Sequence, residues 1–198
     1  MTTLLFIQEN AMSPLSPLRM LWSSGHSWDS LSQSHPTLSA SFYRLVLPGS
    51  LLGTAMILFA ASFHGNVYGA EVSFAHWVLI SLLFLATNWL AVPLMAWVIR
   101  QSVHAPARPA FADCYRLAAI APLPIWLSTL TLLLPSPLFN MACGLIGLLA
   151  SGLLLYHGLD ALFEHDDSVS TQSMAYTVFS VGALVWLFVA ALLMLPLL

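Results

Sequence analysis

The sequence predicts an all-α polytopic membrane protein, built as a bundle of five transmembrane helices. Its mean hydropathy is +0.86 with only 7% charged residues, whereas charged residues make up about a quarter of a soluble domain. The chain also contains five uncharged apolar stretches, each close to the ~20 residues that cross the hydrocarbon core of a bilayer. These stretches lie at about 45–63, 75–99, 117–134, 138–159 and 174–197.

A serine-rich tail, residues 1–44, precedes the first predicted span. Residues 17–30 place two tryptophans and two leucines at helical spacing, a pattern typical of a short helix lying in the membrane interface. A disordered tail with scattered apolar residues explains the same pattern equally well. The remaining residues, 45–198, are nearly all needed for spans and connections, so we expect one membrane domain and no separate soluble domain.

Small residues follow one face of two predicted spans. The first span contains Gly49 and Gly53, a G-x-x-x-G pair that lets another helix approach closely. A longer stripe in the fourth span consists of Gly144, Gly147, Ser151 and Gly158. We expect both faces to pack against neighbouring helices of the bundle, and a dedicated face for self-association is the less favoured alternative.

The second and third spans contain a polar residue and prolines at mid-membrane depth. Asn88 lies near the centre of the second span and is followed by Pro93, while the third span contains Pro122 and Pro124. A proline leaves a backbone carbonyl without its helical partner, so we expect a kink or a bound water. The Asn88 amide is expected to hydrogen-bond across the bundle; the alternative is a role in a solute or proton path. Two broken helices are compatible with a cavity.

Orientation depends on five arginines, because the chain has no lysine. The arginines are Arg19, Arg44, Arg100, Arg108 and Arg116. With five spans they all fall on one side of the membrane, which the positive-inside rule makes cytoplasmic. We therefore predict a cytoplasmic N-terminus and a periplasmic C-terminus. The arginines serve as topology anchors or as contacts to anionic lipid headgroups.

One acidic segment contains candidate metal ligands. His157, Asp160 and Glu164 share a face if the fourth helix continues, and these side chains suit a divalent cation. A solvated acidic loop with an interfacial histidine explains the same residues more simply, so we predict neither a metal nor a cofactor. Cys114 and Cys143 fall near opposite membrane faces in the predicted topology, too far apart for a disulfide.

The search for catalytic motifs is negative. The sequence has no G-x-S-x-G nucleophile elbow, no H-E-x-x-H zinc motif, no Walker lysine motif and no dinucleotide-binding glycine fingerprint. No charged residue falls within the predicted spans, which disfavours ion-coupled transport. The net charge of -3 gives no reason to expect a nucleic-acid partner. We therefore predict that the protein is not an enzyme.

Hydrophobic motifs spread along most of the chain are similar to those of a known family. They are Pro17–Trp22, Ser41–Gly49, Phe111–Cys114, Leu117–Ser128 and Gly152–Leu159. Together they resemble the Yip-domain family, whose eukaryotic members are named for interacting with Ypt/Rab GTPases, and more closely its small bacterial branch. The chain departs from the family pattern at Ala119-Ile120, where Gly-Tyr is frequent. It also lacks the eukaryotic tail motif, so Rab binding is not carried over.

The resemblance implies a five-helix, multi-pass protein of the bacterial inner membrane with a cytoplasmic N-terminus, and it implies no established reaction. Our leading hypothesis is a protein that binds or organises membrane lipids, other integral membrane proteins or copies of itself, as a scaffold or accessory subunit. The alternative is a channel or transporter for a small neutral solute or lipid, through a cavity near Asn88. A third, weaker hypothesis is a metal or pH sensor that uses His157.

Overall fold

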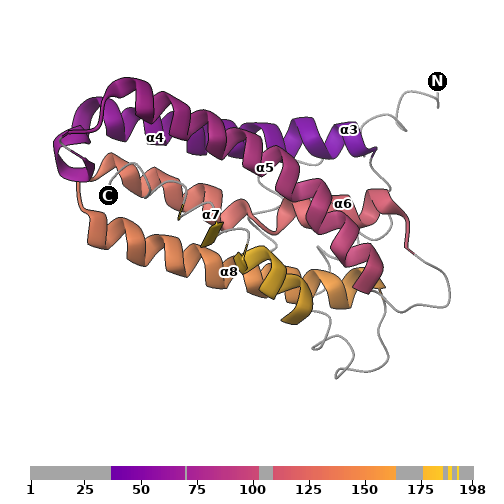
Figure 1. Ribbon diagram of the computed structural model, residues 1–198. Coiled ribbons are helices and arrows are strands. Elements are labelled where there is room, and N and C mark those ends of the chain that lie inside the picture. Colours follow the sequence, from indigo (N-terminus) through magenta and orange to yellow (C-terminus); the bar gives the residue numbers. More distant parts are fainter. Residues whose placement is uncertain are drawn as a thin grey trace, which may run out of the picture.

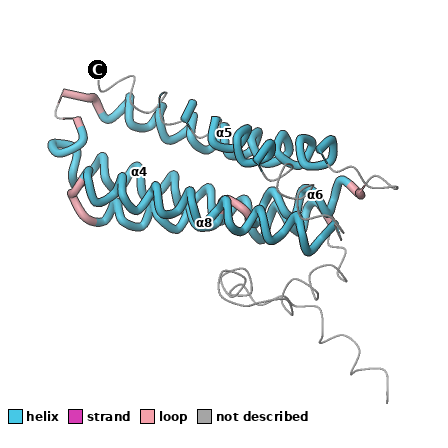
Figure 2. Tube along the Cα trace, turned by 90° about the horizontal axis from the view of Figure 1, so that it is seen from below, coloured by secondary structure: helices cyan, strands magenta, loops and turns pink. Residues whose placement is uncertain are grey.

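Four helical segments in the described part of the chain are long and apolar enough to cross a membrane. The structure is a computed structural model that describes residues 37–69, 71–102, 109–163, 176–184, 187–188 and 191. The four segments are Leu38–Tyr68, Phe74–Ser102, Phe111–Leu133 and Pro137–Asp160. Their long axes run roughly parallel in an elongated bundle (Figures 1 and 2).

These segments are divided into eight helical elements. The elements are α3 (Leu38–Ser41), the π-helical turn η1 (Phe42–Val46), α4 (Leu47–Tyr68), α5 (Phe74–Ser102), α6 (Phe111–Ile120), α7 (Leu123–Ser128), the 3-10 segment η2 (Thr129–Leu133) and α8 (Pro137–Phe163). The described residues contain no strand. The predicted all-α, multi-span class is therefore confirmed.

The first segment begins seven residues before the predicted start at 45, because α3 and η1 extend the helix backwards. Thr37 caps α3, and its Oγ1 accepts a hydrogen bond from the backbone N–H of Ala40 at 3.3 Å. The π-helical turn ends at Val46, two residues before Pro48. A proline ring clashes with the carbonyl four residues earlier in a regular α-helix, and the wider turn relieves this clash at Arg44.

The two proline-containing segments behave differently. Pro93 lies inside α5, which remains one continuous helix. The third segment is interrupted instead, because α6 ends at Ile120 and α7 begins at Leu123. Pro122 sits in this interruption as the N-cap of α7. The break predicted for the third span is therefore present, whereas the second span accommodates its proline.

A tight turn joins η2 to α8 at the end of the bundle opposite α6 (Figure 1). Pro137 starts α8, as expected for a residue that has no N–H to leave unpaired in the first turn. The end of α4 is tied to this turn, because the Tyr68 hydroxyl donates to the Leu134 carbonyl at 3.1 Å and accepts from the Asn140 amide. The third and fourth segments therefore form an antiparallel hairpin.

The core lies between layers formed by α4 with α5 and by α6–α7 with α8. α5 packs against α4 and α6, while α8 packs against α7 and α6. The largest buried side chains include Ile99, Leu117, Ile120 and Trp126. Residues 176–184 are helical and lie between α5 and α8. There Phe179 covers Gly152, and the methyl group of Met95 reaches Gly182.

Several predictions concern residues outside the described ones. These are the interfacial helix at 17–30, Arg19, Arg108 and Glu164. The fifth predicted span is described only at 176–184, 187–188 and 191, where the chain is helical. The count of five spans and the membrane orientation therefore remain predictions.

Candidate functional site

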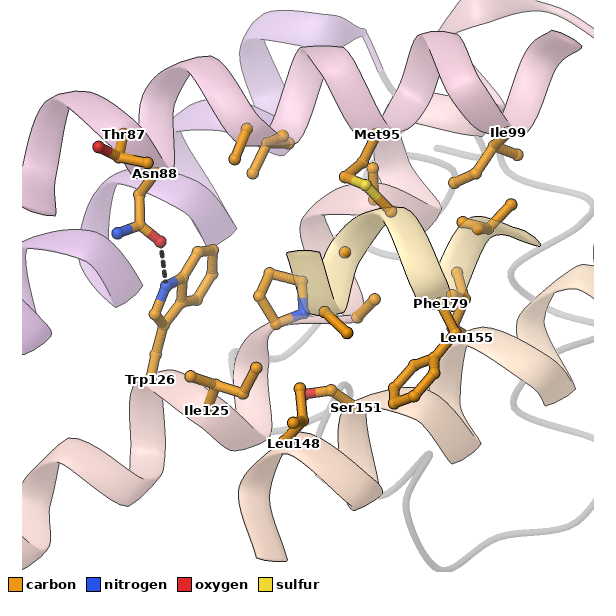
Figure 3. Close-up of a pocket in the computed structure, with 18 of the residues that line it drawn as sticks. Thr87, Asn88, Met95, Ile99, Ile125, Trp126, Leu148, Ser151, Leu155 and Phe179 are labelled. Atoms are coloured by element: carbon orange, nitrogen blue, oxygen red, sulfur yellow. Dashed lines mark hydrogen bonds between the residues drawn. The ribbon is translucent and has the colours of Figure 1, made fainter. Parts of the chain in front are cut away.

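An apolar cavity of about 230 Å³ lies in the middle of the bundle, between α5, α6–α7, α8 and residues 176–184 (Figure 3). The residues that line it are Phe84, Thr87, Asn88, Ala91, Val92, Met95, Ile99, Ala118, Ala121, Pro122, Ile125, Trp126, Leu148, Ser151, Leu155, Val178, Phe179, Gly182 and Ala183. The α5 members recur every three or four residues, so they occupy one face of that helix. None of these described lining residues carries an ionisable side chain.

Asn88 lines this cavity and also hydrogen-bonds across the bundle. Its Oδ1 accepts from the indole Nε1–H of Trp126 at 2.8 Å (Figure 3), and its Nδ2–H donates to the Phe84 carbonyl at 2.8 Å. Both ends of the amide therefore have a partner in a region without solvent, where an unpaired amide is costly. Asn88 therefore makes an interhelical hydrogen bond and also lines the cavity, while a role in a solute or proton path remains a prediction.

The Gly49–Gly53 pair packs inside the bundle. A Cβ atom on residue 49 would overlap the indole ring of Trp126, and one on residue 53 would lie 2.7 Å from the Phe84 ring. Gly49 thus leaves room for Trp126, which is 1% exposed, to approach α4 while its N–H reaches Asn88 on α5. One glycine, one indole and one amide together fix the spacing of α4, α5 and α7.

The small residues of α8 have unequal surroundings. Gly147 faces α7 closely, because a Cβ atom there would lie 3.0 Å from the Pro124 carbonyl oxygen. Gly144 has no neighbour within 4 Å of the corresponding position, so it does not contribute to this contact. Gly158 is buried, and Ser151 lines the cavity. The close approach of α8 to α7 therefore depends on Gly147 rather than on the whole stripe.

Ser151 differs from the other hydroxyls of the bundle. Its side chain is 7% exposed, and its Oγ has no hydrogen-bond partner in the described part of the chain. A buried hydroxyl without a partner costs about 1–3 kcal/mol. Ser151 lines the cavity, and because its Oγ is covered, this unused donor and acceptor reaches a bound molecule only when the side chain rotates.

The prolines of the third segment contribute to the site in different ways. Pro122 lines the cavity at the break between α6 and α7. Pro124 is buried in α7, where its carbonyl meets Gly147 of α8. Pro93 is partly buried on α5 and is not among the lining residues. Only Pro122 therefore touches the cavity directly.

Two of the predicted anchor arginines are exposed, and a third is not. Arg44 and Arg100 are exposed, at the start of the first segment and the end of α5. Arg116 is 2% exposed, so the assignment of this residue to lipid headgroups is wrong. The reason is that α6 starts at Phe111, which places Arg116 inside the helix, one turn after Asp113, whose charge attracts it.

The start of α6 at Phe111 also corrects the predicted start of the third span. The third segment was predicted to start at 117 without charged residues, but it begins at Phe111 and includes Asp113 and Arg116. These two charges lie near one end of the segment and outside the cavity. The objection to an ion-coupled path through the cavity is therefore unchanged.

The candidate metal ligands are not gathered in the described structure. His157 and Asp160 are exposed on α8, and the His157 Nδ1 lies 2.8 Å from the Leu153 carbonyl oxygen of its own helix. No group of three or more histidine, cysteine, aspartate or glutamate side chains occurs among the described residues. Cys114 and Cys143 are free. Nothing in the described part therefore favours the sensor hypothesis.

Sequence reasoning missed three contributors to the cavity. Trp126 is not among the predicted site residues, although a buried indole N–H needs an acceptor and Asn88 needs a donor across the bundle. Met95 and Phe179 close the cavity from α5 and from residues 176–184. Both are ordinary apolar residues whose position follows only from the assembled bundle, so the sequence contains no signal for them.

Four apolar segments, three of which line a cavity without ionisable side chains among its described residues, define a multi-pass helical membrane protein. A family model described as the Yip1 domain matches residues 18–194, nearly the whole chain, and the protein belongs to this family. The family indicated by the motifs is therefore confirmed. Comparisons with curated proteins and with solved structures find no match.

Proposed function

We propose that this protein binds and organises lipids or other proteins within the membrane and catalyses no reaction. The observation that carries the proposal is the mid-bundle cavity, which offers an apolar binding surface without an acid or a base among its described lining residues. Such a site recognises a ligand by shape and by hydrogen bonding at very few positions. It is suited to holding a membrane component rather than to proton transfer.

The outward face of α8 supports the same proposal. Large apolar side chains are exposed along it, at Leu138, Met141, Leu145, Ile146, Leu149 and Leu153. In a bilayer this face contacts lipid tails or the helix of another membrane protein. The protein thus presents apolar surface both inside and outside the bundle.

The proposed topology has five spans in a bacterial inner membrane. Helical residues at 176–184, with Val178 fully buried, are consistent with a fifth span that packs back against the bundle. η1, the last turn of α5, and α6 meet at one end of the bundle and carry Arg44, Arg100 and Arg116. The positive-inside rule makes this end cytoplasmic, which puts the N-terminus inside and the C-terminus in the periplasm.

Extraction in polymer-bounded native nanodiscs tests the function. Lipids and proteins retained by the full-length chain would be identified by mass spectrometry and compared with those retained by an unrelated multi-pass protein of similar size. We expect at least one lipid class or membrane protein to be enriched reproducibly. A chain that retains the same lipids as the control and no protein would contradict the proposal.

The second candidate function is passage of a small neutral solute or lipid. The observation that favours it is that the cavity is lined by Asn88, at mid-span depth, and by Pro122, at the break between α6 and α7. The internal partners of Asn88 weigh against it, because a transported solute would need those same hydrogen-bonding groups. Flux of glycerol or of a fluorescent lipid into proteoliposomes above the protein-free rate would favour this candidate.

A further inference from the structure

We infer that the cavity binds a neutral, hydrocarbon-rich amphiphile with one uncharged oxygen group that hydrogen-bonds to Ser151. The inference rests on the proposed function, because it names the ligand class of the same cavity. It is carried by three observations: the unused hydroxyl, the apolar lining and the depth of the site in the bundle.

The first observation is that Ser151 lacks the bond that other helical hydroxyls make. Eight of them donate to a carbonyl three or four residues earlier: Ser50, Thr54, Ser62, Ser81, Thr87, Ser128, Thr129 and Thr131. This local bond is the usual solution where water is absent. Ser151 is more than nine-tenths buried, and its Oγ has no such partner in the described part of the chain. Ser151 lines the cavity (Figure 3), and its Oγ is covered by neighbouring atoms, so the side chain must rotate to present the hydroxyl to the cavity.

The second observation is that the other polar side chains of the described lining already make hydrogen bonds within the protein. The Asn88 amide bonds to Trp126 and to the Phe84 carbonyl, and the Thr87 hydroxyl donates to the Leu83 carbonyl. The rest of the described lining is hydrocarbon, aromatic ring or the Met95 thioether. A bound molecule therefore meets a largely apolar wall, in which Ser151 is the described lining residue whose side chain has no hydrogen-bond partner.

The volume of the cavity fits a segment of such a molecule. At about 230 Å³ it exceeds the ~150 Å³ of an apolar protein cavity that holds benzene. It is smaller than the ~300–1,000 Å³ of pockets for drug-sized ligands. The cavity therefore accommodates part of a hydrocarbon chain or a compact apolar group.

The third observation concerns charge and depth. Ser151 lies in the interior of the Pro137–Asp160 segment, and no ionisable side chain is present in the described lining to balance a charged group. A phosphate or ammonium headgroup has no partner at this depth and stays at the membrane surface. Only the acyl chain of a phospholipid would enter, and it would leave Ser151 without a bond. A hydroxyl or carbonyl on a neutral chain satisfies it.

Photo-crosslinking of the purified full-length protein tests the inference. The probe is hexadecanol carrying a diazirine within its chain, incorporated into detergent micelles, and labelled peptides are located by mass spectrometry. Unlabelled hexadecanol, hexadecane and a phosphatidylethanolamine serve as competitors, compared at equal mole fraction in the micelle. We expect saturable labelling at cavity residues such as Met95 and Phe179, with hexadecanol competing about three- to tenfold better than hexadecane, the ratio expected for one hydrogen bond.

Two substitutions with matched controls make the result specific. Ser151→Ala is expected to abolish the preference for the alcohol, whereas Ser62→Ala, which changes an exposed serine of α4, leaves it intact. Ala91→Leu adds a bulky group to the cavity wall and is expected to remove the labelling of Met95. Ala86→Leu, on the exposed face of the same helix, retains that labelling. Thermal melting confirms that each variant is folded.

The outcomes separate this inference from the proposed function. Equal competition by alcohol and alkane in the unaltered protein, or an alcohol preference that survives Ser151→Ala, would overturn the Ser151 site. A protein that still retains a specific lipid or partner in nanodiscs would then keep the proposed function. Competition by phosphatidylethanolamine alone, independent of residue 151, would identify an acyl-chain groove and would also overturn the inference.

Discussion

Asn88 shows how one partly buried amide joins helices at mid-membrane depth. Its Oδ1 reaches Trp126 on α7, and the indole ring lies against Gly49 of α4. In a bilayer, hydrogen bonds of this kind stabilise helix association by about 0.6–2 kcal/mol. This is less than the free energy of burying either group without a partner would suggest, because separated helices also find other partners. The chain of contacts therefore sets the relative positions of three helices more than it adds to their stability.

A double-mutant cycle on Asn88 and Trp126 tests this pairing. We expect Asn88→Ala and Trp126→Phe each to lower the free energy of unfolding by about 1–3 kcal/mol, because each leaves the other group buried without its partner. The double variant should lose less than the sum by about 0.6–2 kcal/mol. Unfolding by dodecyl sulfate in mixed micelles measures these values.

Trp89→Phe provides the control for this cycle. The Trp89 indole donates to the Ser50 hydroxyl at 3.2 Å, but Trp89 is 41% exposed, whereas Trp126 is 1% exposed. Replacing Trp89 should therefore lower the free energy of unfolding by less than replacing Trp126. Strictly additive losses at Asn88 and Trp126 would show that the two side chains do not act as a pair.

Arg116 shows the effect of burial on a charge. Arg116 is buried within α6, one turn after Asp113. Arg100, in contrast, is exposed at the end of α5. We expect Arg116→Gln to destabilise the protein by about 1–3 kcal/mol, since buried polar groups lose their partners. Arg100→Gln should change stability by less than about 0.5 kcal/mol, as surface substitutions usually do. Equal melting temperatures for the two variants would contradict a structural role for Arg116.

At the scale of elements, the apolar stretches predicted helix positions well but placed the starts of the first and third helices too late. Bilayer thickness sets the length of an apolar run, so the runs are visible in the sequence. The first and third helices begin at Leu38 and Phe111, earlier than predicted, because a search for uncharged runs stops at Arg44 and Arg116. Backbone hydrogen bonding continues past such residues, and the π-helical turn before Pro48 has no distinct sequence signal.

The cavity could be predicted only in part. Asn88 and the prolines indicated a polar position and a broken helix at mid-membrane depth, and both features are present at the cavity. Ser151 was grouped with the small packing residues of α8, because an unused hydroxyl becomes apparent only when the neighbouring helices are in place. The same holds for Gly144, which shares the stripe of Gly147 but has no neighbour within 4 Å of its Cβ position.

The contact between α7 and α8 gives a matched pair of glycine substitutions. Gly147→Ala places a methyl group 3.0 Å from the Pro124 carbonyl oxygen and 3.3 Å from the Ile125 Cα. These backbone atoms cannot rotate away, so we expect a loss of about 1–3 kcal/mol, as for other overpacked sites. Gly144→Ala meets no neighbour within 4 Å and should be neutral or stabilising by up to about 1 kcal/mol through helix propensity.

Thermal melting of both glycine variants in detergent provides the measurement. The expected order of melting temperatures is Gly144→Ala at or above the unaltered protein, and Gly147→Ala clearly below it. Similar decreases for both variants would indicate that α8 packs through its whole small-residue stripe. Such a result would contradict the contact described between Gly147 and α7.

At the scale of the whole molecule, the predicted orientation in the membrane depends on where the arginines lie. η1, the last turn of α5, and α6 bring Arg44, Arg100 and Arg116 to one end of the bundle. Only the first two are exposed and available to anionic headgroups, at about 1 kcal/mol for each residue near the surface. Arg116 is buried, so the anchoring depends on fewer arginines than the sequence suggests.

Reporter fusions test this orientation. With five spans and the arginines inside, fluorescent protein inserted after Phe163 should fluoresce and alkaline phosphatase fused after Leu198 should be active, since the enzyme works only in the periplasm. Because about 2 kcal/mol of anchoring comes from Arg44 and Arg100, replacing both by glutamine should give a mixed topology, with reduced phosphatase activity at the C-terminus. Replacing the buried Arg116 instead should leave the ratio of the two reporters unchanged. Phosphatase activity after Phe163, or fluorescence of a fluorescent protein after Leu198, would mean that the bundle is inverted or that residues 174–197 do not cross the membrane.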